Sequence, residues 1–327
     1  MTTAGSTPAD GPLTDGPPAD AETLAALVRA GLIPAGVTPT KVADGAIWSE
    51  GPCWIPETGT VRFSDIPGDR ILEHDPAAGA TRVHRSGVEF TNGRTRRGDG
   101  AIVQCSHGRR RVEVERDGAV EPLVERFAGR RFNSPNDVVV ASDGAVWFTD
   151  PPYGIVNPRE GHPGEFEYGG CHVFRVDPGT GEAEPMITDM GDPNGLAFSP
   201  DESVLHVSDT SAGRLASGGH RHVRSYDVVR TDDGVRCTGG RVLFTPPSGV
   251  PDGIRVDAAG RVWSSAADGV HVYSADGAHL GAAPVPEVVA NLCFGGPEGL
   301  DLYIAATTGL YHLPVLVRDT TWARLGG

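Results

Sequence analysis

Apolar residues from about residue 41 onward occur in short runs that alternate with turns rich in Gly, Asp and Pro. This pattern is typical of many short antiparallel strands, and it shows no second long amphipathic helix. Before it, residues 21–32 carry apolar positions at helical spacing and Gly31 as a stop signal, which predicts one short helix. Residues 1–20 hold almost no large apolar side chains and predict a disordered tail.

The strand pattern repeats six times. Each repeat has a polar residue, a short apolar strand, a turn, a second apolar strand and, in most repeats, a small or acidic residue at its end. The repeats cover residues 50–65, 92–107, 136–150, 194–209, 252–267 and 291–307. Their leading residues are Glu50, Asn92, Asn136, Asn194, Asp252 and Asn291, separated by 42, 44, 58, 58 and 39 positions. Such periods fit one four-stranded blade per repeat.

The sequence therefore predicts an all-β fold, a six-bladed β-propeller over residues 41–327. A helix and linker over residues 21–40 would precede it, after the disordered tail of residues 1–20. We expect an N-terminal strand near Lys41–Gly45 to close the ring beside the C-terminal blade. The 45 Gly and 27 Pro among 327 residues agree with this, because both residues disfavour helix interiors.

The net charge of the chain limits the classes of molecule that it is expected to bind. With 28 Lys and Arg against 43 Asp and Glu, the net charge of −15 disfavours nucleic acid and anionic membranes as partners. No apolar run approaches the roughly 20 residues that span a bilayer. The five cysteines contain no CxxC pair, and no secretory signal is visible, so we expect reduced thiols in a cytoplasmic protein. The oligomeric state stays open.

The six leading residues carry the candidate chemistry. If each begins the innermost strand of its blade, their side chains meet at the axis, and every one of them offers an oxygen. Two carboxylates among amide oxygens suit a hard cation, Ca²⁺ first, with Mg²⁺ or Mn²⁺ as alternatives and Zn²⁺ less favoured. The competing interpretation is that Asn-Gly and Asp-Gly only start strands as turn residues. Six aligned polar positions favour the metal interpretation, because converging buried polar groups need a partner.

A second set of side chains closes four of the repeats and would rim the same mouth: Asp65, His107, Asp150 and Asp209. They would either contact substrate, or serve as turn residues or as hydrogen-bonding partners between neighbouring blades. His107 would orient substrate or carry a proton, with a structural role as the alternative. His220 and His222 form a histidine pair without further zinc ligands around them, which favours a surface strand. The motifs GxSxG, HExxH, SxxK and the P-loop are absent, which disfavours a serine hydrolase.

Four phrases of the chain resemble the senescence marker protein/gluconolactonase/luciferin-regenerating-enzyme family, and its bacterial gluconolactonases in particular. They are WSEGPCW (48–54), RFNSPNDVVVASDGAVWFTDPPYG (131–154), DPNGLAFSPDESVLHVSD (192–209) and VPDGIRVDAAGRVW (250–263). The resemblance implies a six-bladed propeller with a divalent cation on its axis. It implies Glu50, Asn194 and Asp252 as the metal ligands, and Asn136 beside the metal in contact with substrate or water.

The resemblance also implies a function, the metal-dependent hydrolysis of a small-molecule sugar lactone. The cation would polarise the ester carbonyl for attack by water, with Asp252 as the first choice of base and Asp209 or Asp150 as the second. The further expected substrate contacts are Asn136, His107, Asp150, Tyr153, Asp209, Asn92 and Asn291. Ser134 replaces an arginine of the mammalian members, and Gly154 lies near a position where they have a sugar-binding glutamate, so the polyol contacts differ. The alternatives are a phosphotriesterase of the same propeller type and a non-catalytic ligand-binding propeller.

Overall fold

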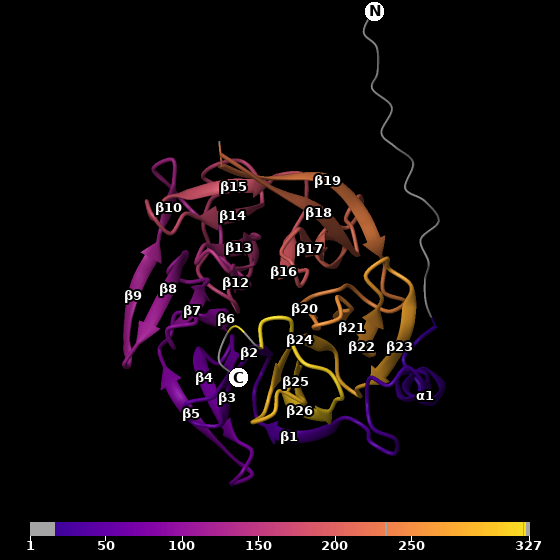
Figure 1. The fold of residues 1–327 in the computed structure, drawn as a ribbon. Coiled ribbons are helices and arrows are strands. Elements are labelled where there is room, and N and C mark those ends of the chain that lie inside the picture. Colours follow the sequence, from indigo (N-terminus) through magenta and orange to yellow (C-terminus); the bar gives the residue numbers. More distant parts are fainter. Residues whose placement is uncertain (1–16, 233, 323, 325–327) are drawn as a thin grey trace, which may run out of the picture.

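Six four-stranded antiparallel sheets surround one axis in the computed structural model, which describes residues 17–232, 234–322 and 324 (Figure 1). This confirms the six-bladed β-propeller and the number of its blades. In each sheet the strands follow one another from the axis to the rim, as expected when tight hairpins join consecutive apolar runs. The six leading residues of the repeats therefore lie within two positions of the first residue of the innermost strands.

The strands have the following bounds. Blade 1 contains β2 (Ser49–Ile55), β3 (Thr60–Asp65), β4 (Arg70–Asp75) and β5 (Ala80–Ser86). Blade 2 contains β6 (Thr91–Arg96), β7 (Ile102–Ser106), β8 (Arg111–Arg116) and β9 (Ala119–Val124). Blade 3 contains β12 (Val138–Val140), β13 (Val146–Asp150), β14 (His172–Val176) and β15 (Ala183–Ile187). Blade 4 contains β16 (Pro193–Phe198), β17 (Val204–Asp209), β18 (His222–Thr231) and β19 (Gly234–Phe244). Blade 5 contains β20 (Ile254–Val256), β21 (Val262–Ala266), β22 (Gly269–Tyr273) and β23 (His279–Pro284). Blade 6 contains β24 (Val289–Gly295), β25 (Asp301–Ala306), β26 (Gly309–Pro314) and β1 (Thr40–Asp44).

Three shorter elements lie in the connections. A hairpin of β10 (Arg126–Phe127) and β11 (Arg130–Arg131) separates blades 2 and 3. Helix α2 (Tyr153–Val156) follows β13, and the 3₁₀ helix η1 (Ser211–Gly213) follows β17. Both follow the second strand of a blade, so they stand at the same end of the propeller as the start of the innermost strands.

Strand β1 closes the ring. It pairs antiparallel with β26, so blade 6 takes its outermost strand from the N-terminal side of the chain and its other three from the C-terminal side. Lys41 supports this joint by bonding to Asp44 and Glu287, both at 2.8 Å. The predicted closure near Lys41–Gly45 is therefore confirmed, and it leaves β26 with a partner along its outer edge.

The apolar core lies between neighbouring blades. Alternate residues of each strand face the next blade, and the buried side chains gather in clusters at these contacts. Trp147, for example, packs edge-on against Phe198 of blade 4, with ring centroids 5.3 Å apart. Because each blade buries a face on both sides, no single blade holds a complete core.

Helix α1 (Ala21–Arg29) packs outside the ring against β23 (Figure 1). Asp20 caps it by accepting from the Thr23 N–H at 2.9 Å, and Leu27 is fully buried. Gly281 allows this approach, since a Cβ there would lie 2.6 Å from the Thr23 carbonyl oxygen. The predicted disordered tail falls mostly on residues 1–16, which lie outside the described residues. Its last part is ordered, because the Ala19 N–H donates to Asp268 Oδ2 at 2.8 Å.

The segment after β26 returns across the axis. The Thr320 N–H donates to Val256 at the end of β20, and Arg324 reaches the Val140 carbonyl at the end of β12. Innermost strands end at this side and begin at the other, so the segment covers the end of the channel opposite the leading residues. Among the described helices, none combines the length and the apolar character needed to cross a bilayer.

Candidate active site

The structure brings all six leading residues to one mouth of the channel. A bulge in the innermost strand occurs at or next to the leading residue in blades 1, 2, 4 and 6, where the register with the second strand shifts. In blades 3 and 5 the innermost strand starts only two residues later. A bulge re-aims a side chain out of the regular alternation, which explains how these side chains leave the ladder.

A glycine follows four of the six leading residues because the next blade comes too close for a side chain. A Cβ on Gly51 would lie 2.2 Å from the Asn92 carbonyl oxygen, and one on Gly195 would lie 2.3 Å from the Asp252 carbonyl oxygen. Gly195 has no positive φ, so its glycine serves this close approach and not a turn. The Asn-Gly and Asp-Gly pairs are thus contacts between blades.

The ring residues are linked to one another by hydrogen bonds. The Asn92 amide donates to Asn136 Oδ1 at 2.7 Å, and the Asn136 amide donates to Asn194 Oδ1 at 2.6 Å. Across the ring, the Asn291 amide donates to Glu50 Oε2 at 3.1 Å. These bonds fix the rotamers of the amides, so the ring is preorganised by pairs of residues that lie 44, 58 and 241 positions apart in the chain.

A cavity of about 320 Å³ opens above the ring. Its floor is formed by ring residues, and its walls by residues of the loops that follow the second strands or precede the innermost strands. The ring residues in its lining are Glu50, Asn92, Asn136, Asn194 and Asp252. Wall residues include Trp48, Tyr153, Glu160, Thr210, Arg214 and Val250. This mixture of apolar walls and a few convergent polar groups is the usual form of a small-molecule site.

Two carboxylates, Glu50 and Asp252, lie in this floor, and neither forms an ion pair with any residue that the structure describes. Burial raises the pKa of Glu50 to about 7. Burial and the charge of Glu50 raise the pKa of Asp252 well above its ordinary value. Asp252 Oδ1 is buried and finds no hydrogen-bond partner among the residues that the structure describes, and the same holds for Asn92 Oδ1. Such atoms are costly unless a proton, a cation or a ligand meets them.

The donor set fits a divalent cation. Glu50, Asn194 and Asp252 offer two carboxylates and an amide oxygen, which are the ligands that Ca²⁺ and Mg²⁺ prefer. A cation among them would offset the repulsion of the two buried carboxylates and satisfy the unpartnered Asp252 oxygen. Asn136 lies beside this set, since its amide bonds to Asn194.

Asp65, Asp150 and Asp209 share a different arrangement. Each closes a second strand and accepts the backbone N–H groups that stand three and two positions before the leading residue of its own blade. Asp150 accepts from Asn133 and Ser134 at 2.7 and 2.8 Å. The corresponding donors are Ile47 and Trp48 for Asp65, and Gly191 and Asp192 for Asp209.

All three carboxylates are fully buried and do not line the cavity. This placement favours a structural role, in which each carboxylate fixes the backbone just before the innermost strand. It disfavours the substrate contact that we expected for Asp150 and Asp209. It also leaves Asp252 as the one candidate base, of the three considered, that faces the cavity.

His107 lies behind the ring and is fully buried. Its Nδ1 lies 3.1 Å from the Glu160 carbonyl, which can only accept, so Nδ1 carries the proton in the neutral ring. Nε2 then accepts from the Asn92 amide at 3.3 Å and also lies 3.2 Å from Asn136 Oδ1. Burial lowers the pKa of His107 to about 4, so the ring is neutral. His107 thus positions Asn92 and the loop that carries Glu160, in agreement with the structural alternative.

Tyr153 lines the cavity, as expected for a substrate contact, and its hydroxyl bonds to Thr210. Sequence reasoning missed Thr210, Glu160 and Arg214. Arg214 is held by Asp192 through two bonds of 2.8 and 2.7 Å. These residues lie in loops without a repeated pattern, so no spacing in the sequence could have identified them.

The chain is similar to known proteins over most of its length. The sequence profile described as the SMP-30/gluconolactonase/LRE-like region matches residues 48–308. The chain is 32% identical to a gluconolactonase of Zymomonas mobilis over 310 residues, covering 86% of this chain and 81% of that protein. It is 31% identical to a pentonolactonase of Haloferax volcanii over 280 residues, covering 83% and 85% of the two chains.

A solved structure shows the same likeness. The chain is 35% identical to a gluconolactonase of Xanthomonas campestris, with a TM-score of 0.80 over 94% of this chain and 98% of that one. The similarity therefore extends over most of the chain.

Proposed function

This chain belongs to the SMP-30/gluconolactonase/LRE-like family and is a lactone hydrolase, and from this premise we propose that it opens a sugar lactone in the axial cavity with the help of a divalent cation. One observation carries the proposal. Glu50 and Asp252, two buried carboxylates, meet on the floor of a cavity of about 320 Å³, and one Asp252 oxygen has no partner among the described residues.

Glu50, Asn194 and Asp252 are the residues that would hold the cation. When bound, a divalent cation at this place supplies an electrophile that polarises the lactone carbonyl and stabilises the negative charge of the tetrahedral intermediate. Ca²⁺ is the first expectation from the all-oxygen donor set.

Asp252 is the proposed base. The Asp252 oxygen that does not hold the cation accepts a proton from a water molecule as the water oxygen bonds to the lactone carbonyl carbon. When the tetrahedral intermediate collapses, the bond from that carbon to the ring oxygen breaks, and the ring oxygen takes the proton back from Asp252. The product is a hydroxy acid, which releases its own proton to solvent at neutral pH.

The asparagines of the ring are the proposed substrate contacts. Asn92 Oδ1 has no partner among the described residues, so it is available to accept from a substrate hydroxyl. Asn136 uses one amide hydrogen on Asn194 and keeps a second one for the substrate. Tyr153 and Thr210 bond to each other on the wall and add hydroxyl groups that suit a polyol.

An assay of acid release in weak buffer tests the function. We expect the protein to hydrolyse a gluconolactone or a pentonolactone, to lose activity after removal of metal ions, and to regain it with Ca²⁺. Mg²⁺, Mn²⁺ and Zn²⁺ are compared in the same assay. Equal activity of the metal-stripped protein would show that the cation has no part in the reaction.

Two further arms address the alternatives. Faster hydrolysis of an organophosphate triester than of any lactone would identify a phosphotriesterase. Binding of Ca²⁺ without turnover of any lactone in the panel would identify a ligand-binding propeller.

A further inference from the structure

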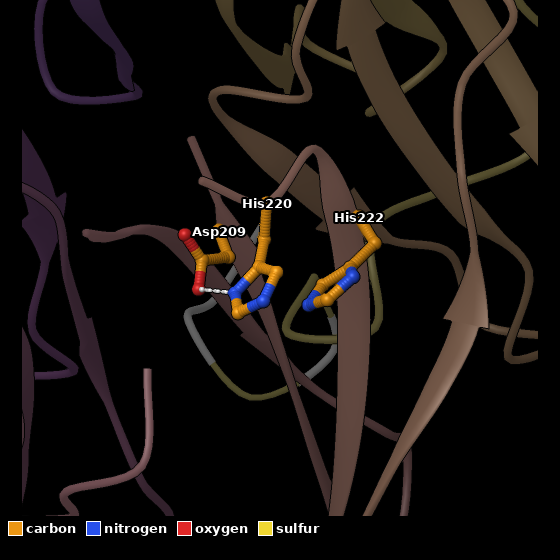
Figure 2. Close-up of side chains that lie close together, drawn as sticks. All are labelled: Asp209, His220 and His222. Atoms are coloured by element: carbon orange, nitrogen blue, oxygen red, sulfur yellow. Dashed lines mark hydrogen bonds and ion pairs between the residues drawn. The ribbon is translucent and has the colours of Figure 1, made fainter. Parts of the chain in front are cut away.

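A second cluster of metal-binding side chains lies in blade 4, outside the axial cavity. Asp209 ends β17, His222 begins β18 opposite it in the ladder, and His220 stands two residues earlier in the connecting loop (Figure 2). The sequence placed no third ligand near the two histidines, because Asp209 comes 11 positions before His220. The strand pairing supplies it, so the expectation of a plain surface strand was incomplete.

The three side chains converge closely enough for one ion. One ligand atom from each residue lies within 4.8 Å of the other two. His220 Nδ1 is 3.3 Å from Asp209 Oδ2, which is long for an N–H···O bond of about 2.9 Å. The same distance is the edge expected between two ligands of tetrahedral zinc, about 3.3–3.5 Å. An ion can therefore sit between these two atoms without moving either of them.

The carboxylate is already oriented for this use. Asp209 Oδ1 accepts from the Asp192 and Ser211 N–H groups, and Oδ2 accepts from the Gly191 N–H at 2.8 Å. Among the described residues, Oδ2 accepts only this one backbone N–H, and it also faces His220. Hydrogen bonds that fix a ligating carboxylate are a regular feature of metal sites.

Blade 3 contains the same arrangement without the second imidazole. Asp150 pairs with His172 in the ladder, as Asp209 pairs with His222. There the third position is taken by Tyr168, whose hydroxyl donates to Asp150 Oδ2. Blade 4 has His220 in place of that tyrosine, with its ring stacked at 4.8 Å on His222. The substitution replaces a neutral hydroxyl by a nitrogen ligand at one of two equivalent places.

We infer that Asp209, His220 and His222 form a binding site for a first-row transition-metal dication, Zn²⁺ in the first place, separate from the axial site. Two imidazoles and one carboxylate are a nitrogen-rich set, which Zn²⁺ prefers and Ca²⁺ does not. His220 is exposed, so water completes the coordination. The inference does not depend on the lactone chemistry.

The site would fasten the loop between β17 and β18. His220 is joined to η1 by two bonds, from its N–H to Ser211 Oγ and from the Ala212 N–H to its carbonyl. The same loop carries Thr210 and Arg214 to the wall of the axial cavity. A bound ion would link the His220 end of this loop to Asp209 at the end of β17. It would thereby limit the movement of the loop residues that form the cavity wall.

Calorimetric titration of the untagged protein with Zn²⁺, in excess Ca²⁺, tests the inference. We expect one zinc site that Asp252→Asn leaves unchanged and that His220→Tyr, the blade 3 arrangement, weakens by more than about tenfold. His222→Gln should weaken it similarly. His172→Gln, at the equivalent ladder position of blade 3, is the matched control and should bind Zn²⁺ as the unaltered protein does.

Unchanged zinc affinity in folded His220→Tyr or His222→Gln would overturn the inference, as would loss of the site in Asp252→Asn. Circular dichroism identifies any variant that fails to fold. A second measurement needs no variant: Zn²⁺ should slow hydrogen exchange of residues 210–222 in the unaltered protein. It should leave residues 151–171 of blade 3 unchanged. Equal exchange of residues 210–222 with and without Zn²⁺ would also overturn the inference.

Discussion

Asp252 and Asp150 are both aspartates at the same mouth of the propeller, but their surroundings differ. Asp252 faces the cavity with an oxygen that has no partner among the described residues. Asp150 is fully buried and accepts two backbone N–H groups and the Tyr168 hydroxyl. At the scale of single residues, the existing hydrogen bonds therefore distinguish the two carboxylates. Asp252 is a candidate for catalysis, and Asp150 holds a loop.

Asp252→Asn should abolish lactone hydrolysis while the fold remains. We expect turnover to fall by about 10²–10⁴-fold, the usual contribution of a positioned base. The thermal midpoint should stay equal or rise, because the change removes one of two buried like charges. Steady-state kinetics and thermal unfolding check this. Near-normal turnover would remove Asp252 from the mechanism.

Asp150→Asn should act in the opposite sense. An amide offers only one acceptor oxygen, so either the Asn133 or the Ser134 N–H loses its partner in a buried place, at a cost of about 1–3 kcal/mol of unfolding free energy. Denaturant unfolding measures this loss, and the folded fraction should retain turnover. A variant as stable as the unaltered protein but inactive would restore Asp150 as a catalytic candidate.

At the scale of elements, each blade uses the same devices with different residues. The second strands carry hydroxyls that reach the next blade: Thr149 donates to the Asn194 carbonyl and Ser208 to the Asp252 carbonyl, both at 2.6 Å. These bonds set the position of one leading residue from the neighbouring blade. Strand β17 adds a buried titratable group, His206, whose Nδ1 lies 2.8 Å from Ser225 Oγ on β18.

His206 should make stability depend on pH. Burial, and to a smaller extent the charge of Arg241, lower the pKa of His206 to about 4 in the folded protein. The unfolded chain binds this proton below about pH 6.5 and the folded chain does not, so His206 destabilises the fold as the pH falls from 6.5 to 4. Its contribution reaches about 1.4 kcal/mol per pH unit.

The variant His206→Gln isolates this effect, because glutamine can still bond to Ser225 but does not titrate. The difference in unfolding free energy between the two proteins should shift by about 1–2 kcal/mol in favour of the variant between pH 7 and pH 5. Urea unfolding at both pH values measures it. A difference that stays constant with pH would contradict the assignment.

At the scale of the whole molecule, ring closure makes the site. Asn291 of blade 6 donates to Glu50 of blade 1, so the first and last blades meet at one of the proposed ligands. Their contact is secured on the outside by the pairing of β1 with β26 and at the far end of the channel by the segment after β26. An open ring would separate Glu50 from Asp252 and leave no cation site.

Removal of residues 1–45 should therefore cost more than a terminal deletion ordinarily does. The deletion removes α1 and β1 and exposes the edge of β26. It also removes Leu32 and Ile33, and so uncovers the apolar side chains of blade 6 that share a cluster with them. We expect a less cooperative unfolding transition, aggregation and loss of lactone hydrolysis. A chain that begins at residue 17 keeps every contact described above and is the matched control. Full activity of the shorter chain would show that blade 6 closes without β1.

Much of this protein could be predicted from sequence because the propeller is built from local hairpins. The periods between Glu50, Asn92, Asn136, Asn194, Asp252 and Asn291 gave the blade count, and the common position of these residues brought six oxygens to one axis. The glycines after them were harder to interpret. Their reason, a carbonyl of the next blade about 2 Å from the missing Cβ, exists only in the closed ring.

What the sequence determined by itself was thus everything that repeats: the strands, their turns and the ring of polar side chains. Tertiary structure decided what does not repeat. It turned Asp150 and Asp209 away from the cavity, brought Glu160 and Arg214 to its wall, and placed Asp209 beside His220. The physical reason is that a repeat is encoded in short-range alternation of apolar and polar residues. Contacts between loops depend on the packing of neighbouring blades, which no local pattern records.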